Sequence, residues 1–235
     1  MAQASLAIPS HARYTALMPT PRAAIFDLDG TLLDTLDDLA DSANEALTAA
    51  GLPAHPVDAY RTFVGDGIHT LVQRILPADN SGAETVAQVL ALYRAAYGRR
   101  WNNKTRPYAG ITDMLHELSL RPVKLAVLSN KPQKFTELCM AHHLPGNAFE
   151  IVLGQRDSVP RKPDPAGALE ISSAFQVSPG EVLFIGDTKT DMDTATAAGM
   201  RAIGVSWGFR PVEELRQHGA GVILNHPAEL LGLFA

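Results

Sequence analysis

The stretch IFDLDGT at residues 25–31 decides the interpretation of this chain, because an apolar run ends there in Asp27 and Asp29, beside Gly30. On an extended segment, side chains two positions apart point to the same side of the chain. Two neighbouring carboxylates are costly unless a cation lies between them or one carries a proton. The stretch therefore predicts a chemical site at the end of a strand, although an isolated pair of this kind is equally typical of a solvated acidic turn.

Composition limits the kind of protein that this chain can be. The 235 residues are 46% hydrophobic and 19% charged, which are ordinary values for a globular protein. The formal net charge is −5 and basic runs are short, so we expect no nucleic-acid partner. The sequence has no apolar run long enough to cross a membrane and no secretory signal, so we expect no membrane partner and a cytoplasmic location. The single cysteine, Cys139, excludes an internal disulfide and is predicted to be a buried apolar residue without a functional role.

Short apolar runs separated by longer helix-like stretches predict a parallel sheet built from βαβ units. We therefore expect a fold of the α/β class with a parallel sheet at its core. The predicted strands are 23–27, 124–130, 181–187 and 201–208, an edge strand at 221–225, and a further strand around 149–154 and 157–160.

Residues 36–105 differ in character and predict an all-helical cap domain inserted after the first strand. An apolar helical stripe begins the insert, and Gly51 and Pro53 end its first helix. The stripe comprises Leu36, Leu39, Ala40, Ala43, Leu47 and Ala50. The predicted division is a flexible tail at 1–20, a catalytic core at 21–35 and 106–235, and the cap at 36–105, with hinges near 34–36 and 106–110.

Further polar residues follow the other predicted strands. Ligands of an open parallel sheet bind beyond the carboxyl ends of its strands, so these residues are expected to converge on one site. Taken singly, each is typical of a solvated loop or helix start. They are Ser129 and Asn130, Lys162 in RKPDP at 161–165, and Asp187 with Asp191 in GDTKTD at 186–191, where the two acids share a face if a helix begins there.

Acids, a lysine and hydroxyl groups in one crevice suit the transfer of a phosphoryl group. Carboxylate oxygens are good ligands for Mg²⁺, which would neutralise the repulsion among Asp27, Asp29 and Asp187, while Lys162 would balance a phosphate. One aspartate can attack phosphorus to form an aspartyl-phosphate, and a second carboxyl can serve as acid and then as base. We expect Asp27 to be the nucleophile and Asp29 the acid and base. The expected hydrogen-bond donors to the phosphoryl oxygens are Gly30, Thr31, Ser129 and Asn130.

Four segments in this order resemble the motifs of the haloacid dehalogenase superfamily: DLDGTLLDT at 27–35, LSN at 128–130, RKPDP at 161–165 and GDTKTD at 186–191. The resemblance implies a Rossmann-like core, Mg²⁺ and an aspartyl-phosphate on Asp27. It further implies that Asp29 touches the metal through its backbone carbonyl. The dehalogenase branch is not expected, because its members lack the second aspartate of this motif. The remaining implied roles are phosphate ligand for Ser129 and Lys162, metal ligand for Asp187, and outer-shell residue of the metal for Asp191.

Within the superfamily the chain most resembles the phosphoglycolate phosphatase branch. RTFVGDGIHTLVQRIL at 61–76 is similar to that branch's substrate loop, with Gly65, Asp66 and Gly67, and GVSWGF at 204–209 agrees with it. The resemblance implies hydrolysis of a small phosphorylated metabolite, 2-phosphoglycolate. Backbone amides of a glycine-rich turn could approach its carboxylate, although VGDG is also typical of a plain turn between helices.

Other readings of the sequence stay open. A β-phosphoglucomutase-like phosphotransferase, a pyrophosphatase, or a nucleotide or sugar-phosphate phosphatase could use the same residues. A phospho-accepting signalling domain is opposed by the order of Lys162 before Asp187 and by the long helical insert. A non-catalytic binding module is opposed by the presence of both Asp27 and Asp29. His69 is expected to have a surface or packing role, and the sequence leaves monomer and homodimer equally open.

Overall fold

The structure, a computed structural model, describes residues 19–146 and 149–234. Six parallel strands form one sheet in the order β5-β4-β1-β6-β7-β8, which confirms the predicted α/β fold with a Rossmann-like core. The strands are β1 (Ala23–Phe26), β4 (Lys124–Pro132), β5 (Phe149–Gln155), β6 (Val182–Gly186), β7 (Arg201–Val205) and β8 (Val222–Leu224).

One predicted strand segment is wrong. Residues 157–160 do not extend β5, which ends at Gln155, and the chain turns instead, with the Val159 N–H donating to the carbonyl of Arg156. Pro160 contributes to this outcome because it has no N–H for a ladder hydrogen bond. The segment is therefore a connection between the sheet and the next helix.

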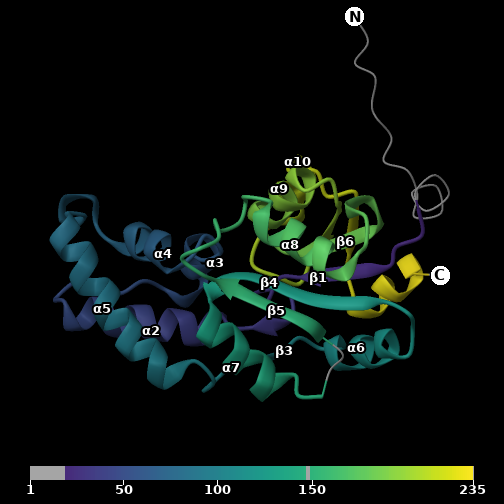
Figure 1. Ribbon diagram of the computed structural model, residues 1–235. Helices are drawn as coiled ribbons and strands as arrows, with labels where there is room; N and C mark the ends of the chain where they lie inside the picture. Colours follow the sequence, from purple (N-terminus) through teal and green to yellow (C-terminus); the bar gives the residue numbers. More distant parts are fainter. Residues whose placement is uncertain (1–18, 147–148, 235) are drawn as a thin grey trace, which may run out of the picture.

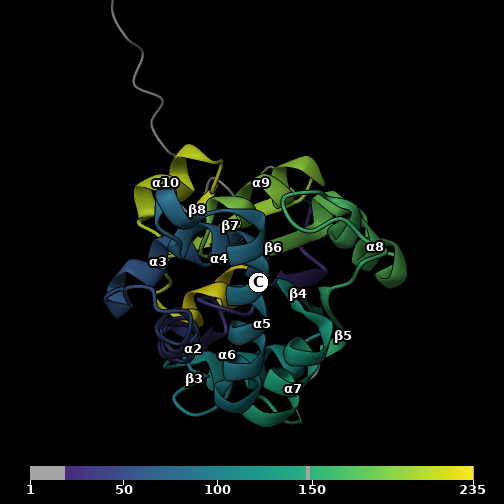
Figure 2. The same ribbon diagram turned by 90° about the vertical axis from the view of Figure 1, so that its left-hand side faces the viewer.

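Helices cover both faces of the sheet (Figures 1 and 2). Two separate hydrophobic clusters, one on each face, pack the helices onto the strands. Cys139 is fully buried in the first of these clusters, as predicted, and burial raises the pKa of its thiol to about 11. The first face is covered by α6 (Ile111–Ser119) and α7 (Gln133–His143), and the 3₁₀ segment η4 (Pro227–Phe234) packs against α6. The opposite face is covered by α8 (Ala166–Phe175), the 3₁₀ turn η3 (Pro179–Glu181), α9 (Lys189–Ala197) and α10 (Val212–Gln217).

The segment between the first and second core strands forms a helical insert that lies beyond the arrowheads of the sheet (Figure 1). Its helices surround a third hydrophobic cluster of their own. Five of the six residues of the predicted apolar stripe are buried in α2, whereas Ala50 lies past the end of that helix and is half-buried. The insert contains α2 (Leu36–Ala49), η1 (Val57–Ala59), α3 (Tyr60–Phe63), α4 (Ile68–Ile75), η2 (Ala78–Asn80) and α5 (Ala83–Arg100).

The two connections between insert and core are tied together. The predicted hinge segments overlap two short antiparallel strands, β2 (Leu33–Asp34) and β3 (Arg106–Pro107). Next to them, the buried Asp38 carboxylate accepts hydrogen bonds from the backbone N–H groups of Lys104 and Thr105 and from the Thr105 hydroxyl. The predicted domain limits themselves stay a prediction, and residues 1–18 of the predicted tail lie outside the described residues. Across the described part of the chain, no helix combines the length and apolar character needed to span a membrane.

Candidate active site

The centre of the sheet positions the candidate site. Strand β1 lies between β4 and β6, and the chain crosses from one side of β1 to the other between β5 and β6. A crevice forms at such a switch point beyond the carboxyl ends of the strands. Asp27 follows β1, Asp187 follows β6, and Ser129 and Asn130 lie in the last part of β4, so the structure brings the sequence-predicted residues to one place.

Asp27 is buried against Lys162. The Asp27 Oδ1 lies 2.9 Å from the lysine Nζ, which also donates to Asp191 Oδ1 at 2.6 Å. Burial, only partly offset by Lys162, raises the pKa of Asp27 to about 7. Burial by itself would lower the pKa of Lys162, but the attraction of Asp191 and Asp27 outweighs it and raises that pKa, so the lysine stays charged.

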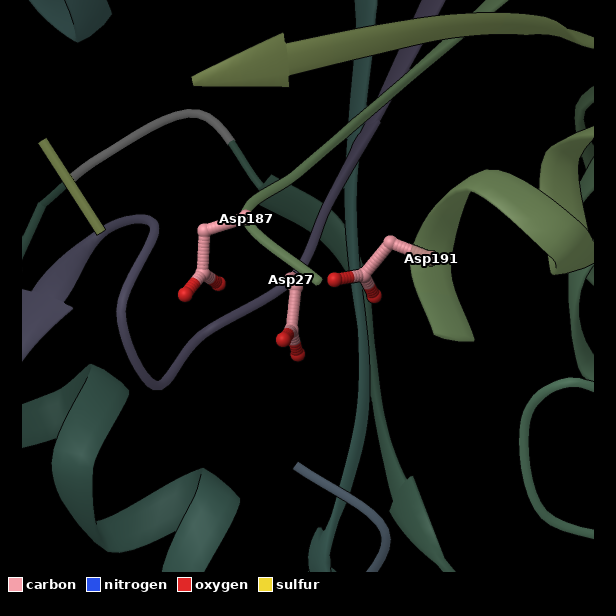
Figure 3. Close-up of side chains that lie close together, drawn as sticks. All are labelled: Asp27, Asp187 and Asp191. Carbon is pink, nitrogen blue, oxygen red and sulfur yellow. The ribbon is translucent and has the colours of Figure 1, made fainter. Parts of the chain in front are cut away.

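Asp191 holds Lys162 in place. Its second carboxylate oxygen accepts hydrogen bonds from the Thr188 backbone N–H at 3.0 Å and from the Thr188 hydroxyl at 2.7 Å, in the capping box that begins α9. A side chain at Gly186 would collide with Asp191, since its Cβ would lie 2.3 Å from the aspartate Cβ. Asp187 precedes α9, so the two acids are not on one helical face as the spacing had suggested. They meet because the loop and the helix start converge (Figure 3).

Asp187 is fully buried and fixed from two sides. The Thr31 hydroxyl donates to its Oδ1 at 3.0 Å, and the backbone N–H of Phe209 donates to its Oδ2 at 2.8 Å. Burial, reinforced by the charges of Asp191 and Asp27, raises its pKa well above the ordinary value. Gly30 makes this approach possible, because it has a φ of +86° and a Cβ there would lie 2.3 Å from Asp187 Oδ2.

Three buried carboxylates could hold a metal ion here. One oxygen from each of Asp27, Asp187 and Asp191 lies within 4.8 Å of the others, and Figure 3 shows the three side chains next to one another. The raised pKa values of Asp27 and Asp187 indicate that the protein alone does not compensate their charges. A hard divalent cation would supply that compensation. Asp191 is neutralised by the charged Lys162 at 2.6 Å, whereas Asp187, among the described residues, accepts hydrogen bonds only from the uncharged Thr31 hydroxyl and Phe209 N–H. Asp187 therefore has the greater need of a cation and is better suited than Asp191 as a direct ligand beside Asp27.

Asp29 faces a second buried lysine, which sequence reasoning missed. Lys131 Nζ lies 2.8 Å and 3.1 Å from the two carboxylate oxygens of Asp29, and 4.9 Å from the centre of the Tyr97 ring. Burial by itself would lower the pKa of Lys131, but its interactions with neighbouring groups, of which the charge of Asp29 is the largest, together raise that pKa, so this lysine also stays charged. The signal was present in the sequence, because Lys131 follows directly on the LSN segment at 128–130.

The predicted phosphate donors have different surroundings. Ser129 lines the pocket and its hydroxyl accepts a hydrogen bond from the Lys131 N–H at 3.3 Å. The amide of Asn130, by contrast, is used within the protein: its nitrogen donates to the carbonyls of Gly65 and Lys162, and its oxygen accepts from the Lys162 N–H. The Gly30 N–H donates to the carbonyl of Leu33 within its own loop. These contacts position Lys162 and the loops around the site.

A pocket lies between the insert and the ends of the strands. The core contributes the acids Asp27 and Asp29 and the basic Lys131 to its lining, and the insert contributes mainly apolar side chains. It is lined by Asp27, Asp29, Ser129, Asn130, Lys131 and Pro132 of the core, and by Leu39, Val64, Gly65, Gly67, Ile68, Leu71, Tyr93 and Tyr97 of the insert.

The predicted substrate loop divides between this pocket and the surface. Gly65 and Gly67 line the pocket, whereas Asp66 lines a separate surface hollow with the exposed His69. The Asp66 carboxylate accepts hydrogen bonds from the Thr190 hydroxyl at 2.6 Å and from Arg74 at 2.5 Å. Burial would raise the pKa of Asp66, but these two hydrogen bonds and the charges of Arg74 and Arg210 together lower it. Asp66 thus links the insert to α9 of the core.

Comparison with known proteins places this geometry in a family. Residues 24–205 match the haloacid dehalogenase-like hydrolases. The phosphoglycolate phosphatase of Pseudomonas putida is 34% identical over 82% of this chain and 73% of its own length, and that of Nitrosospira multiformis is 36% identical over 84% and 90%. The crystal structure of a predicted phosphoglycolate phosphatase from Haemophilus somnus has a TM-score of 0.85 at 27% identity, covering 93% of this chain and all of that one.

The match to the family spans all four of the quoted motifs and so supports the interpretation that was based on them. It confirms the predicted superfamily and the prediction that the protein is an enzyme, and the relatives confirm the resemblance to phosphatases of that superfamily. The chain belongs to the haloacid dehalogenase-like hydrolase family.

Proposed function

We propose that this protein is an Mg²⁺-dependent phosphatase that hydrolyses 2-phosphoglycolate to glycolate and inorganic phosphate through an aspartyl-phosphate on Asp27. The observation that carries the proposal is the buried contact of Asp27 with Lys162, 2.9 Å apart, beside Asp187 at the switch point of the sheet. A charged lysine next to a carboxylate and a cation site can attract a phosphate dianion and bring it to the nucleophile. The naming of the relatives as phosphoglycolate phosphatases supports this substrate.

Asp27 and Asp187 would hold the metal directly, with the backbone carbonyl of Asp29, and Asp191 would act from the outer shell by holding Lys162. Bound Mg²⁺ would screen the charge between the carboxylates and the phosphate and would polarise the phosphorus–oxygen bonds. The acids of this site have the oxygen donors that this ion prefers.

The chain's own residues would perform the chemical steps. An oxygen of Asp27 attacks phosphorus, and the bond from phosphorus to the glycolate oxygen breaks. Asp29, which faces Lys131 as a carboxylate, takes up a proton from solvent beforehand and gives it to that leaving oxygen. Asp29 then takes a proton from a water molecule, whose oxygen attacks the same phosphorus. The bond to Asp27 breaks, and inorganic phosphate is released. Lys162 and the Ser129 hydroxyl hold the phosphoryl oxygens through both steps.

The helical insert would act as a cap over this chemistry. It closes the pocket with Gly65 and Gly67, and Asn130 joins the cap loop to the core through the Gly65 carbonyl at 3.1 Å. Exclusion of bulk water strengthens the electrostatic contacts inside such a pocket. The partner is a small phosphorylated metabolite, with no role for nucleic acid or membrane, and the proposed location is the cytoplasm.

Phosphate release tests the proposal. The wild-type protein is assayed with 2-phosphoglycolate, a panel of sugar phosphates and pyrophosphate, with Mg²⁺ and with a chelator, and Asp27→Asn serves as the blank. We expect Mg²⁺-dependent release that is strongest with 2-phosphoglycolate and absent from the blank. Equal release across the panel would refute the substrate, and conversion of a sugar phosphate into its isomer without phosphate release would favour a phosphotransferase.

A further inference from the structure

Lys131 is a buried charge that the steps above do not use. Its side chain is only 3% exposed, and its ion-pair partner Asp29 is needed elsewhere, at the leaving oxygen. Among the described residues that line the pocket under the insert, Lys131 is the single basic one. A buried ammonium group is costly unless a negative partner accompanies it. The lysine therefore needs a replacement partner whenever Asp29 turns to the substrate.

The position of Lys131 determines which part of a substrate it meets. Asp27 lies at the phosphorus and Asp29 must reach the leaving oxygen, and Lys131 Nζ lies 2.8 Å from Asp29 Oδ1. The lysine is thus next to the first atoms of the leaving group. On the proposed substrate, a carboxylate follows the ester oxygen after one carbon, so it would fall at this ammonium group.

The remaining lining agrees with a small acid. Leu39, Ile68 and Leu71 present apolar surface to the pocket, which would leave the hydroxyl groups of a sugar without hydrogen-bond partners. Tyr93 is fully buried at the same pocket, and its hydroxyl has no hydrogen-bond partner among the described residues. A carboxylate beside Lys131 would provide an acceptor for such a hydroxyl.

We propose that Lys131 is the residue that recognises the substrate's carboxylate, exchanging Asp29 for it when the substrate enters. The substrate class is then the phosphate ester of a short 2-hydroxy acid, an assignment that rests on the proposed phosphatase function. The exchange also explains why a buried lysine lies against the expected acid and base, since the arriving carboxylate frees Asp29 from Lys131, and Asp29 can then take up the proton that it gives to the leaving oxygen.

The test compares kcat/KM for 2-phosphoglycolate with kcat/KM for its neutral amide, 2-phosphoglycolamide. The ratio of acid to amide reports only the contribution of the substrate's carboxylate, because a general loss of catalysis lowers kcat/KM for both compounds. A charge-assisted contact predicts a wild-type ratio of about 10 to 100. Lys131→Met should bring the ratio close to one and Lys131→Arg should keep most of it. Lys134→Met, which changes an exposed lysine three positions further along the chain, in the first turn of α7, should leave the ratio unchanged.

A binding measurement covers the case in which Lys131→Met has no measurable turnover. Calorimetry on Asp27→Asn, with and without Lys131→Met, should show that only the protein with Lys131 binds the acid more tightly than the amide. A preference that persists without Lys131, in either assay, would refute the assignment and place carboxylate recognition at Gly65–Gly67. Equal phosphate release from acid and amide by the wild-type protein would also refute the assignment. Failure of the proposed function looks different, since the wild-type protein would then release phosphate from neither compound.

Discussion

Asp27→Asn is predicted to stabilise the metal-free protein, and the gain should grow with pH. The pKa of the Asp27 carboxyl is about 7 in the folded protein against an ordinary value of 3.8, because it is buried. Between these pH values the unfolded chain has lost its proton and the folded chain keeps it, so stability falls as pH rises, and above pH 7 the loss is complete. Asparagine does not titrate and escapes this loss.

The magnitude follows from the two pKa values. Each pKa unit corresponds to ~1.4 kcal/mol, so the variant should gain roughly 3 kcal/mol on wild type between pH 5 and pH 8. For a chain of this size, that gain corresponds to about 6–12 °C in melting temperature. Relief of the neighbouring Asp187, whose pKa is raised in part by Asp27, acts in the same direction.

The assay is thermal unfolding of both proteins in a chelator at pH 5, 6, 7 and 8. Asp79→Asn, which changes an exposed aspartate in η2, is the control and should show no such trend. With Mg²⁺ at pH 8, wild type should have the higher melting temperature, because the ion stabilises it more than it stabilises the variant, which lacks one carboxylate ligand. A difference that does not change with pH, or that shrinks as pH rises, would refute the reasoning.

Two further substitutions test how the site and the connections to the insert are built. Gly30→Ala should lower the free energy of unfolding by at least ~1–2 kcal/mol through backbone strain, and it should weaken Mg²⁺ binding because the new Cβ displaces Asp187. Thermal unfolding measures the first effect and calorimetry the second. Gly51→Ala is its matched control, with a φ of +73° and no atom near the added Cβ, so equal metal binding in the two variants would contradict the account. Asp38→Asn should lower the free energy of unfolding by ~1–3 kcal/mol, because the amide group of the new asparagine would face the N–H and hydroxyl donors of Thr105. A melting temperature equal to that of wild type would show that the contact between residues 38 and 105 does not hold the two connections together.

The strands that form the centre of the site could be predicted from sequence because each is a continuous apolar run followed by polar residues. Strands β1, β4 and β6 are buried along nearly their whole length, and this burial selects the residues that make such runs recognisable. The convergence of Asp27 and Asp187 then follows from the geometry of a parallel sheet. In contrast, β2 and β3 contain two residues each, too few for any periodic pattern.

The contacts that the sequence did not disclose join residues far apart in the chain. Lys131 and Asp29 are separated by 102 positions, and their pairing depends on how β4 lies beside β1. Asp66 looked like a pocket residue because of its glycine neighbours, yet its carboxylate meets Thr190, 124 positions away. Local sequence patterns predict where strands and helices lie, but they do not predict which charged side chains come into contact.

The central claim is that Asp27 carries the phosphoryl group during turnover. The most direct measurement is mass spectrometry of peptides after acid quenching of the enzyme in the first turnover with 2-phosphoglycolate and Mg²⁺. The account predicts one phosphoryl group on the peptide that contains Asp27, present only with Mg²⁺ and absent from Asp27→Asn. Phosphate release with no modified peptide, or a phosphoryl group on another residue, would contradict it.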